Sequence, residues 1–189
     1  VGTIAYELRA EQEDAVSKTF SYFMSHEKSE YLWNAKPRFG KTLSTYDLCK
    51  RLQATKGNYA CNILIVTNRP AIANSWYEDF VKFIGTESGF RFVSEVSALK
   101  GKPYVMSRDE YTASLRQKKT DCIEFVSLQD LKGSLYFGGR HDKLKELVNM
   151  QWELLVIDEA HEGVDTAKTD VAFHQIKRNH TLHLSGTPF

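Results

Sequence analysis

Six short apolar runs alternate along the chain with longer stretches in which apolar residues recur at helical spacing. The continuous runs at residues 62–67 and 152–158 are typical of strands that are buried on both faces of a sheet. Weaker strands are predicted at residues 31–35, 90–96, 122–128 and 181–185. No internal repeat or linker divides the series, so we expect one domain over residues 1–189.

Helical spacing fills the intervals between these runs. It is clearest at residues 71–84, where Ile72, Trp76, Phe80 and Phe83 fall on one face of a helix. Further helices are predicted at residues 11–24, 42–52, 109–117, 141–150 and 169–177, with an irregular elaboration at 100–120. Because parallel strands need crossover connections, this order predicts an α/β fold: a mainly parallel sheet with helices on both faces.

The composition is that of a soluble protein with an ordinary core. The 189 residues are 42% hydrophobic, and no apolar run approaches the roughly 20 residues of a membrane span, so no membrane partner is expected. Cys49, Cys61 and Cys122 are far apart and odd in number, which argues against disulfides and predicts a cytoplasmic location. The net charge of +1 neither favours nor excludes nucleic acid.

The loop NAKPRFGKT, at residues 34–42, ends like a phosphate-binding loop and begins unlike one, because Ala35 stands where a glycine is usual. A strand, a glycine turn and a helix place backbone N–H groups around one anionic group. Lys41 can then reach the phosphates of a nucleotide, and the Thr42 hydroxyl can bind Mg²⁺. Arg38 stands at a position where such loops usually have no side chain, and we expect its guanidinium to contact the γ-phosphate or a second domain. The alternative is a polar helix terminus without a ligand.

Two adjacent carboxylates, Asp158 and Glu159, follow the strongest predicted strand. Ligands of open α/β sheets bind at the carboxyl ends of strands, and two carboxylates there are costly to bury without a cation. A magnesium–phosphate ligand supplies one, with Asp158 as the metal contact and Glu159 placed to polarise an attacking water. The alternative is a helix cap by Asp158. The glycine loop and this pair together are more specific than either alone.

The tetrapeptide DEAH at residues 158–161 resembles the DEAH box of superfamily 2 helicases and translocases. The segment LRAEQ at residues 8–12 is similar to the first helix motif of that family. The resemblance implies that Gln12 contacts the adenine edge and that His161 couples two motor domains. The residues expected to contact ATP are Arg9, Gln12, Arg38, Phe39, Gly40, Lys41 and Thr42.

Three further segments are similar to family motifs. TNRP at residues 67–70 resembles motif Ia, and VSLQ at residues 126–129 is placed like a later segment that contacts the nucleic-acid backbone. LSGTP at residues 184–188 resembles motif III, which couples hydrolysis to movement. The resemblance implies nucleic-acid contacts by Asn68, Arg69, Ser127 and Gln129, and coupling by Ser185 and Thr187.

The resemblance covers nearly the whole chain and implies the first RecA-like domain, a three-layer P-loop NTPase fold, of an ATP- and Mg²⁺-dependent motor. The second RecA-like domain, with its arginine fingers, lies beyond Phe189, so these 189 residues alone are expected to hydrolyse ATP very slowly. The Ser-Gly-Thr-Pro form of motif III is similar to type I and type III restriction motors and favours DNA over RNA. Nuclease, methyltransferase or specificity partners would lie outside this chain.

Other functions remain alternatives. One is a module in which ATP gates nucleic-acid binding without productive hydrolysis; Glu159 argues against it, because a clamp needs no carboxylate that orients water. A second is an RNA helicase domain. A third is another P-loop enzyme, such as a small-molecule kinase, which the motif III segment at residues 184–188 makes the weakest of the three.

Overall fold

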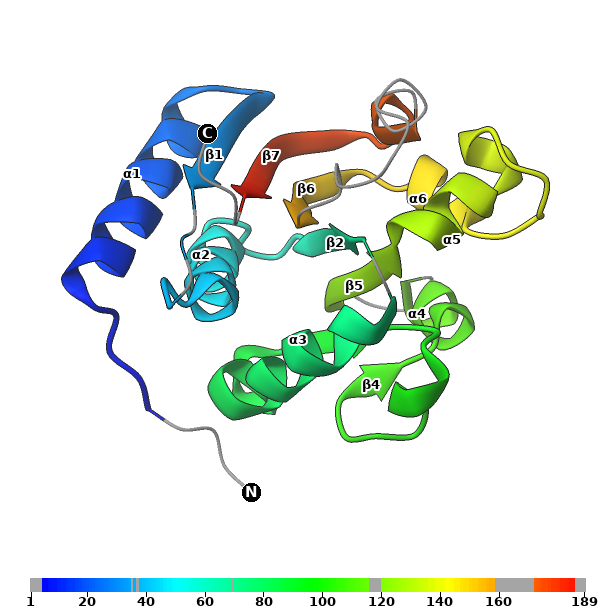
Figure 1. The fold of residues 1–189 in the computed structure, drawn as a ribbon, viewed down its shortest axis with the longest axis horizontal. Helices are drawn as coiled ribbons and strands as arrows, with labels where there is room; N and C mark the ends of the chain where they lie inside the picture. Colours follow the sequence, from blue (N-terminus) through cyan, green and yellow to red (C-terminus); the bar gives the residue numbers. More distant parts are fainter. Residues whose placement is uncertain are drawn as a thin grey trace.

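Among the residues that the computed structural model describes, seven parallel strands form a single sheet, in the order β1-β7-β6-β2-β5-β3-β4 (Figure 1). The structure describes residues 5–34, 36, 38–68, 70–115, 120–158 and 172–185. The strands are β1 (Ser29–Asn34), β2 (Asn62–Thr67), β3 (Phe90–Val93), β4 (Val105–Met106), β5 (Asp121–Ser127), β6 (Trp152–Asp158) and β7 (Arg178–Ser185).

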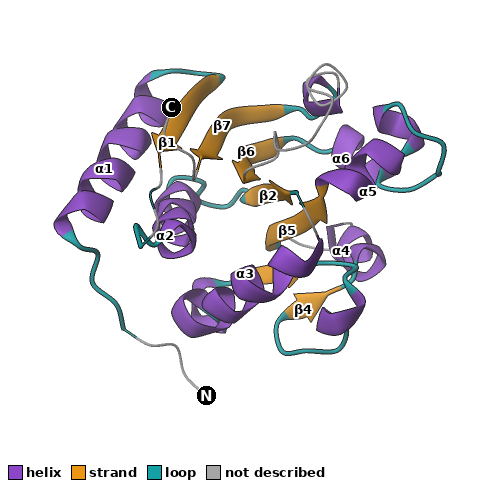
Figure 2. Cartoon of the chain, in the orientation of Figure 1, coloured by secondary structure: helices purple, strands orange, loops and turns teal. Residues whose placement is uncertain are grey.

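Helices connect these strands and cover both faces of the sheet, with α1, α2 and α3 on one side and α4, α5 and α6 on the other (Figure 2). The α-helices are α1 (Ala10–Ser25), α2 (Lys41–Ala54), α3 (Ala73–Asp79), α4 (Arg108–Leu115), α5 (Leu128–Gly133) and α6 (Lys145–Asn149). Short turns are the 3₁₀ segments Pro70–Ile72, Thr86–Ser88, Ser97–Leu99 and Leu135–Phe137 and the π-helical segment Phe80–Ile84.

The central strands are apolar because both of their faces are covered. Along β2, Ile63 and Ile65 pack in the core cluster that contains Trp76 of α3, whereas Leu64 and Val66 pack in the cluster on the opposite face. Successive side chains of a strand point to opposite faces, so a strand between two helical layers needs a continuous apolar run. The predicted α/β fold with a parallel sheet is confirmed.

The predicted strands at 62–67 and 152–158 are confirmed with the same bounds. β7 begins at Arg178, earlier than predicted, and the predicted strand 90–96 ends at Val93. The predicted helix at 71–84 is wrong as one helix: a 3₁₀ turn, α3 and a π-helical segment follow one another. Of the predicted helix 169–177, only residues 172–177 are described, and residues 172–174 are helical.

Two elements were not predicted. β4 lies inside the stretch 100–120 that was expected to be irregular, and its two residues pair with Phe92 and Val93 of β3. α5 begins at Leu128, which the sequence pattern placed in a strand. In the described ranges no helix is long and apolar enough to cross a membrane. The three cysteines are buried, and no disulfide joins them.

Candidate nucleotide-binding site

The carboxyl edge of the sheet brings the glycine loop and the end of β6 together. β1, β7 and β6 are neighbours in register, with Asn34 beside Ser185 and Leu184 beside Asp158. The loop after β1 leads into α2, whose first residue is Lys41. Lys41 Nζ donates a hydrogen bond to Asp158 Oδ1 over 2.8 Å, across 117 positions of sequence. The two predicted phosphate motifs therefore meet, as their positions after parallel strands required.

Gly40 precedes α2 in the left-handed backbone conformation, with φ 79°. The left-handed backbone angle favours glycine, and a Cβ at this position would lie 2.4 Å from Gln12 Nε2, so that the Gln12 side chain would have to shift. The Gly40 carbonyl accepts the first hydrogen bond of α2, from the Ser44 N–H over 3.0 Å. The loop thus places a helix amino terminus at the carboxyl edge, with its positive dipole end and with first N–H groups that have no partner within the helix.

The start of α1 fixes the glycine loop from outside. Gln12 is buried; its Nε2 donates to the Phe39 carbonyl over 2.6 Å, and its Oε1 accepts from the Arg9 N–H over 2.9 Å. The Arg9 guanidinium donates to the carbonyls of Phe39, over 2.8 Å, and Arg38. Both side chains reach the loop that the sequence assigned to ATP. In this structure they hold its backbone, and the adenine contact by Gln12 stays a prediction.

Arg38 has an exposed side chain and a left-handed backbone, with φ 72°. This conformation is uncommon for a residue with a side chain and costs roughly 1–2 kcal/mol. The hydrogen bond from Arg9 to the Arg38 carbonyl helps to hold it. The exposed guanidinium is compatible with a contact to a phosphate or to a second domain, which stays a prediction.

Asp158 is 1% exposed and lies at the last position of β6. Besides Lys41, it has a second donor, because Trp76 Nε1 donates to Asp158 Oδ2 over 3.2 Å. Thr42, in the first turn of α2, donates its hydroxyl proton to Asp79 Oδ2 at the end of α3. Hydroxyl and carboxylate oxygens are the ligands that Mg²⁺ prefers, so Thr42 and Asp158 fit the metal that their motifs predict.

The sequence did not point to Asp79, since a carboxylate on a predicted helix usually lies in solvent. Trp76 is fully buried, in keeping with its place on the apolar face of the predicted helix; its contact with Asp158 was not predicted. The other two tryptophans, Trp33 and Trp152, are also buried.

Asn68, Ser127 and Gln129, three of the four predicted nucleic-acid contacts, lie farther along the same edge. Asn68 follows β2 and is half-buried, and Gln129 of α5 is exposed. Ser127 ends β5 beside Thr67 of β2, is 2% exposed, and accepts from the Asp130 N–H over 3.1 Å as the cap of α5. Ser127 thus has a structural role, and its nucleic-acid contact stays a prediction.

Ser185 ends β7, at the same edge as the glycine loop, and is 3% exposed. Four other predicted site residues lie outside the described residues: Arg69, Glu159, His161 and Thr187. Their proposed roles rest on the sequence.

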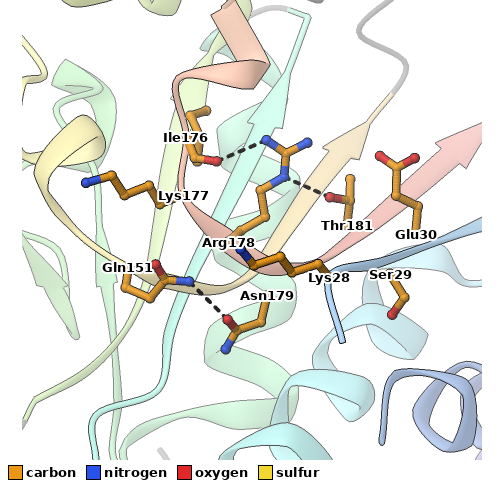
Figure 3. A pocket seen from close by; sticks show the side chains of 9 residues that line it. All are labelled: Lys28, Ser29, Glu30, Gln151, Ile176, Lys177, Arg178, Asn179 and Thr181. Atoms are coloured by element: carbon orange, nitrogen blue, oxygen red, sulfur yellow. Dashed lines mark hydrogen bonds between the residues drawn. The ribbon is translucent and has the colours of Figure 1, made fainter. Parts of the chain in front are cut away.

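The opposite, amino edge of the sheet carries a cavity of about 600 Å³ at the starts of β1 and β7 (Figure 3). Its polar side chains bind one another and the backbone: Arg178 donates to the Thr181 hydroxyl over 2.9 Å and to the Ile176 carbonyl over 3.0 Å, and Gln151 donates to Asn179 over 3.0 Å. Since ligands of such sheets bind at the carboxyl edge, we place the candidate site at Lys41 and Asp158.

A parallel sheet with a glycine loop and a buried carboxylate at its carboxyl edge is the arrangement of a RecA-like P-loop domain. The chain belongs to the family described as type III restriction enzyme, res subunit, whose model matches residues 5–189.

A curated relative from Mycoplasma pneumoniae is described as the C-terminus of a type II restriction enzyme and methyltransferase. It is 24% identical over 179 residues, which cover 92% of this chain and 22% of the relative. The chain thus spans about a fifth of that protein.

Solved structures share the fold at low sequence identity. The type ISP restriction-modification enzyme LlaGI, in a complex with a DNA substrate mimic, has a TM-score of 0.68 at 16% identity, over 97% of this chain and 18% of that one. The SWI2/SNF2 ATPase core of Sulfolobus solfataricus in a complex with double-stranded DNA has a TM-score of 0.66 at 19% identity, and the match covers 99% of this chain and 33% of that one. The UvsW helicase of bacteriophage T4 has a TM-score of 0.61 at 16% identity, and the match covers 99% of this chain and 55% of that one.

Proposed function

We propose that this chain is the ATP-binding motor domain of a DNA-dependent ATPase, a helicase or double-stranded DNA translocase of a restriction-modification or related system. The observation that carries the proposal is the contact between Lys41 and Asp158 over 2.8 Å at the carboxyl edge. The family match and the DNA-bound enzymes of the same fold support DNA as the partner.

Lys41 is the residue that exchanges partners in this proposal. Its side chain is 32% exposed, whereas the Asp158 side chain is 1% exposed. A lysine is a flexible point charge, so Lys41 can turn from the carboxylate to the phosphates of ATP. The backbone N–H groups at the amino terminus of α2 also bind these phosphates, whereas the Phe39 N–H donates to the Lys36 carbonyl over 3.0 Å in this structure. The turn of Lys41 leaves Asp158 Oδ1 facing the phosphates.

Thr42 and Asp158 would hold the magnesium ion at this point. When bound, Mg²⁺ neutralises charge on the phosphate oxygens. Glu159 orients the attacking water, as its position after Asp158 indicates. Gln12 and Arg9 contact the nucleotide, and Arg38 contacts the γ-phosphate or the second domain.

The remaining assigned residues connect hydrolysis to DNA. Asn68, Arg69, Ser127 and Gln129 contact the DNA backbone, and Ser185 and Thr187 relay the state of the γ-phosphate. His161 couples this domain to a second RecA-like domain, whose arginine fingers complete the site. Nuclease, methyltransferase or specificity partners belong to the rest of the system.

The test is ATP turnover by a protein that contains both motor domains, with and without duplex DNA, compared with its Glu159→Gln variant. We expect duplex DNA to raise turnover and the substitution to lower it by about 10²- to 10⁴-fold, the usual contribution of general base catalysis. These 189 residues alone should be nearly inactive.

Each alternative predicts a different result of this experiment. Stimulation by RNA in place of DNA would make the domain part of an RNA helicase. Nucleotide binding without turnover, in the wild type as in the variant, would identify an ATP-gated binding module. Turnover of the 189 residues equal to that of the two-domain protein would contradict the need for a second domain.

A further inference from the structure

Helix α3 contacts both proposed magnesium ligands. Trp76 Nε1 donates to Asp158 Oδ2 over 3.2 Å, and Asp79 Oδ2 accepts the hydroxyl proton of Thr42. Trp76 and Asp79 are three positions apart, so they lie on the same face of the helix. One face of α3 therefore reaches a ligand on β6 and a ligand on α2.

Trp76 fixes one oxygen of a buried carboxylate. Trp76 is fully buried, and Asp158 is 1% exposed, so the carboxylate depends on protein donors. The donor to Oδ1 is Lys41, which the proposed function moves to phosphate. The indole N–H is only a donor, so it stays on Oδ2 when Lys41 leaves. Trp76 thus keeps Oδ1 directed at the site.

Asp79 fixes the direction of the Thr42 hydroxyl. A hydroxyl has one proton to donate and two lone pairs to offer, whereas an ionised carboxylate only accepts. With its proton committed to Asp79, Oγ1 of Thr42 keeps its lone pairs for a metal ion. A carboxylate that orients a metal ligand in this way is a common second layer of metal sites.

α3 is itself held on the helix that carries Thr42. The Tyr46 hydroxyl of α2 donates to the Trp76 carbonyl over 2.5 Å. The Tyr46 ring meets the Trp76 ring edge-on, with 5.5 Å between the ring centroids, and both side chains are fully buried. These contacts set the position of α3 relative to the glycine loop before any ligand binds.

We propose that Trp76 and Asp79 are positioning residues for magnesium, with Trp76 acting through Asp158 and Asp79 acting through Thr42. The inference rests on the proposed nucleotide site and goes beyond it, because neither residue belongs to the glycine loop or the DEAH segment. It assigns α3 a role in metal affinity that is separate from nucleotide affinity.

The experiment measures two dissociation constants for the 189-residue chain. A fluorescent ATP analogue is first titrated in EDTA, and Mg²⁺ is then titrated into the chain saturated with the analogue. We expect Asp79→Ala and Trp76→Phe to raise the apparent dissociation constant of Mg²⁺ by about 10- to 100-fold, the usual loss when an orienting partner of a metal ligand is removed. The affinity in EDTA should stay near the wild-type value, which shows that the variants are folded.

Matched controls come from the same chain. Glu78→Ala removes an exposed carboxylate from α3, and Trp152→Phe removes a fully buried indole that donates to the Leu147 carbonyl. Both should leave the Mg²⁺ constant unchanged. Asp79→Asn keeps an acceptor oxygen and should recover part of the loss that Asp79→Ala causes.

The outcomes separate the inference from the proposed function. If the wild type binds the analogue and Mg²⁺ but Asp79→Ala matches Glu78→Ala, the positioning role is wrong and the nucleotide site stands. If the wild type binds no analogue in either condition, the nucleotide site fails and the inference fails with it. If Trp76→Phe does not fold, Asp79→Ala and Asp79→Asn decide the result.

Discussion

Two buried carboxylates on the same sheet pair with cations in opposite ways. Asp158 ends β6 and has a donor on each oxygen, Lys41 and Trp76. Glu124 lies in the middle of β5, fully buried, with Arg108 Nε donating to its Oε1 over 2.6 Å. The Glu124 Oε2 atom has no hydrogen-bond partner among the described residues. Both carboxylate oxygens of Asp158 therefore accept a hydrogen bond, whereas only one oxygen of Glu124 does so among the described residues.

The cations differ as much as the carboxylates. The Lys41 side chain is 32% exposed and ends beside the glycine loop, whereas the Arg108 side chain is 14% exposed and also lies 3.6 Å from Glu146 Oε1. Burial raises the pKa of Glu124 to about 7, although Arg108 opposes the shift, and Glu146 and Glu95 add to it. A buried ion pair is therefore not by itself evidence of a ligand-binding site. A pair whose cation can turn to another anion is such evidence.

The largest expected effect is the pH dependence of stability caused by Glu124, the carboxylate in the interior of the sheet. The pKa of Glu124 is about 7 in the folded state against an ordinary value of 4.5, so the folded state keeps a proton that the unfolded chain loses. Its contribution to stability is fully present below pH 4.5 and is lost as the pH rises to about 7. At about 1.4 kcal/mol per pKa unit, the loss is about 3 kcal/mol.

Denaturant unfolding across that pH range measures this slope. In Glu124→Gln the side chain no longer titrates, so the free energy of unfolding should vary less with pH by about the same amount. Arg108, Glu146 and Glu95 remain in place in both proteins. A slope that is equal in the wild type and the variant would show that Glu124 does not titrate in this range.

The next effect concerns the glycine loop at the edge. Gly40 and Gly138 both have a positive φ, 79° and 96°, so alanine at either position should cost roughly 1–2 kcal/mol of stability. Of these two positions, only at Gly40 does the added Cβ meet a neighbour, Gln12 Nε2 at 2.4 Å; at Gly138 nothing lies within 4 Å. Gln12 Nε2 donates to the Phe39 carbonyl of the glycine loop, and the added Cβ would displace it. Gly40→Ala should therefore also weaken binding of an ATP analogue by about tenfold, the value of that one hydrogen bond.

Thermal unfolding and an analogue titration of the two glycine variants test this. Equal nucleotide affinity in Gly40→Ala and Gly138→Ala would mean that the shape of the loop does not determine binding.

The smallest effect lies at the end of β5, the strand that carries Glu124. Ser127 caps α5, so Ser127→Ala should cost about 1 kcal/mol of stability. Gln129, two positions on and exposed, should change stability little when replaced by alanine, and should lower duplex DNA affinity if the edge binds DNA. Unfolding and duplex binding of both variants separate the structural role from the proposed contact. Loss of DNA affinity in neither variant would remove this segment from the DNA surface.

Much of the fold follows from the apolar pattern. β2 and β6 could be placed to the residue, because a strand between two helical layers must be apolar on both sides. β4 and α5 could not, because two or six residues are too short to show a period. The nearness of the glycine loop and Asp158 was predictable, since parallel strands end at one edge, but their direct contact through Lys41 was not predicted.

The contacts of α3 were not predictable. They depend on how the helix is rotated over the sheet, and the pattern predicted one regular helix over residues 71–84 where three kinds of helix follow one another. The pairing of Glu124 with Arg108 was equally hidden, because a glutamate inside an apolar strand does not indicate which of its distant neighbours will reach it.

The central claim is that Lys41 is a phosphate-binding residue that pairs with Asp158 in the absence of a ligand. Lys56 is its matched control: its Nζ lies 2.7 Å from Glu153 Oε2, a buried carboxylate at the amino edge. The most direct measurement is the affinity of the chain for an ATP analogue in Mg²⁺, for Lys41→Ala and Lys56→Ala. We expect Lys41→Ala, but not Lys56→Ala, to lower the affinity for the analogue by about 10- to 100-fold, the value of one charged hydrogen bond. Wild-type affinity in Lys41→Ala, or an equal loss in both variants, would contradict it.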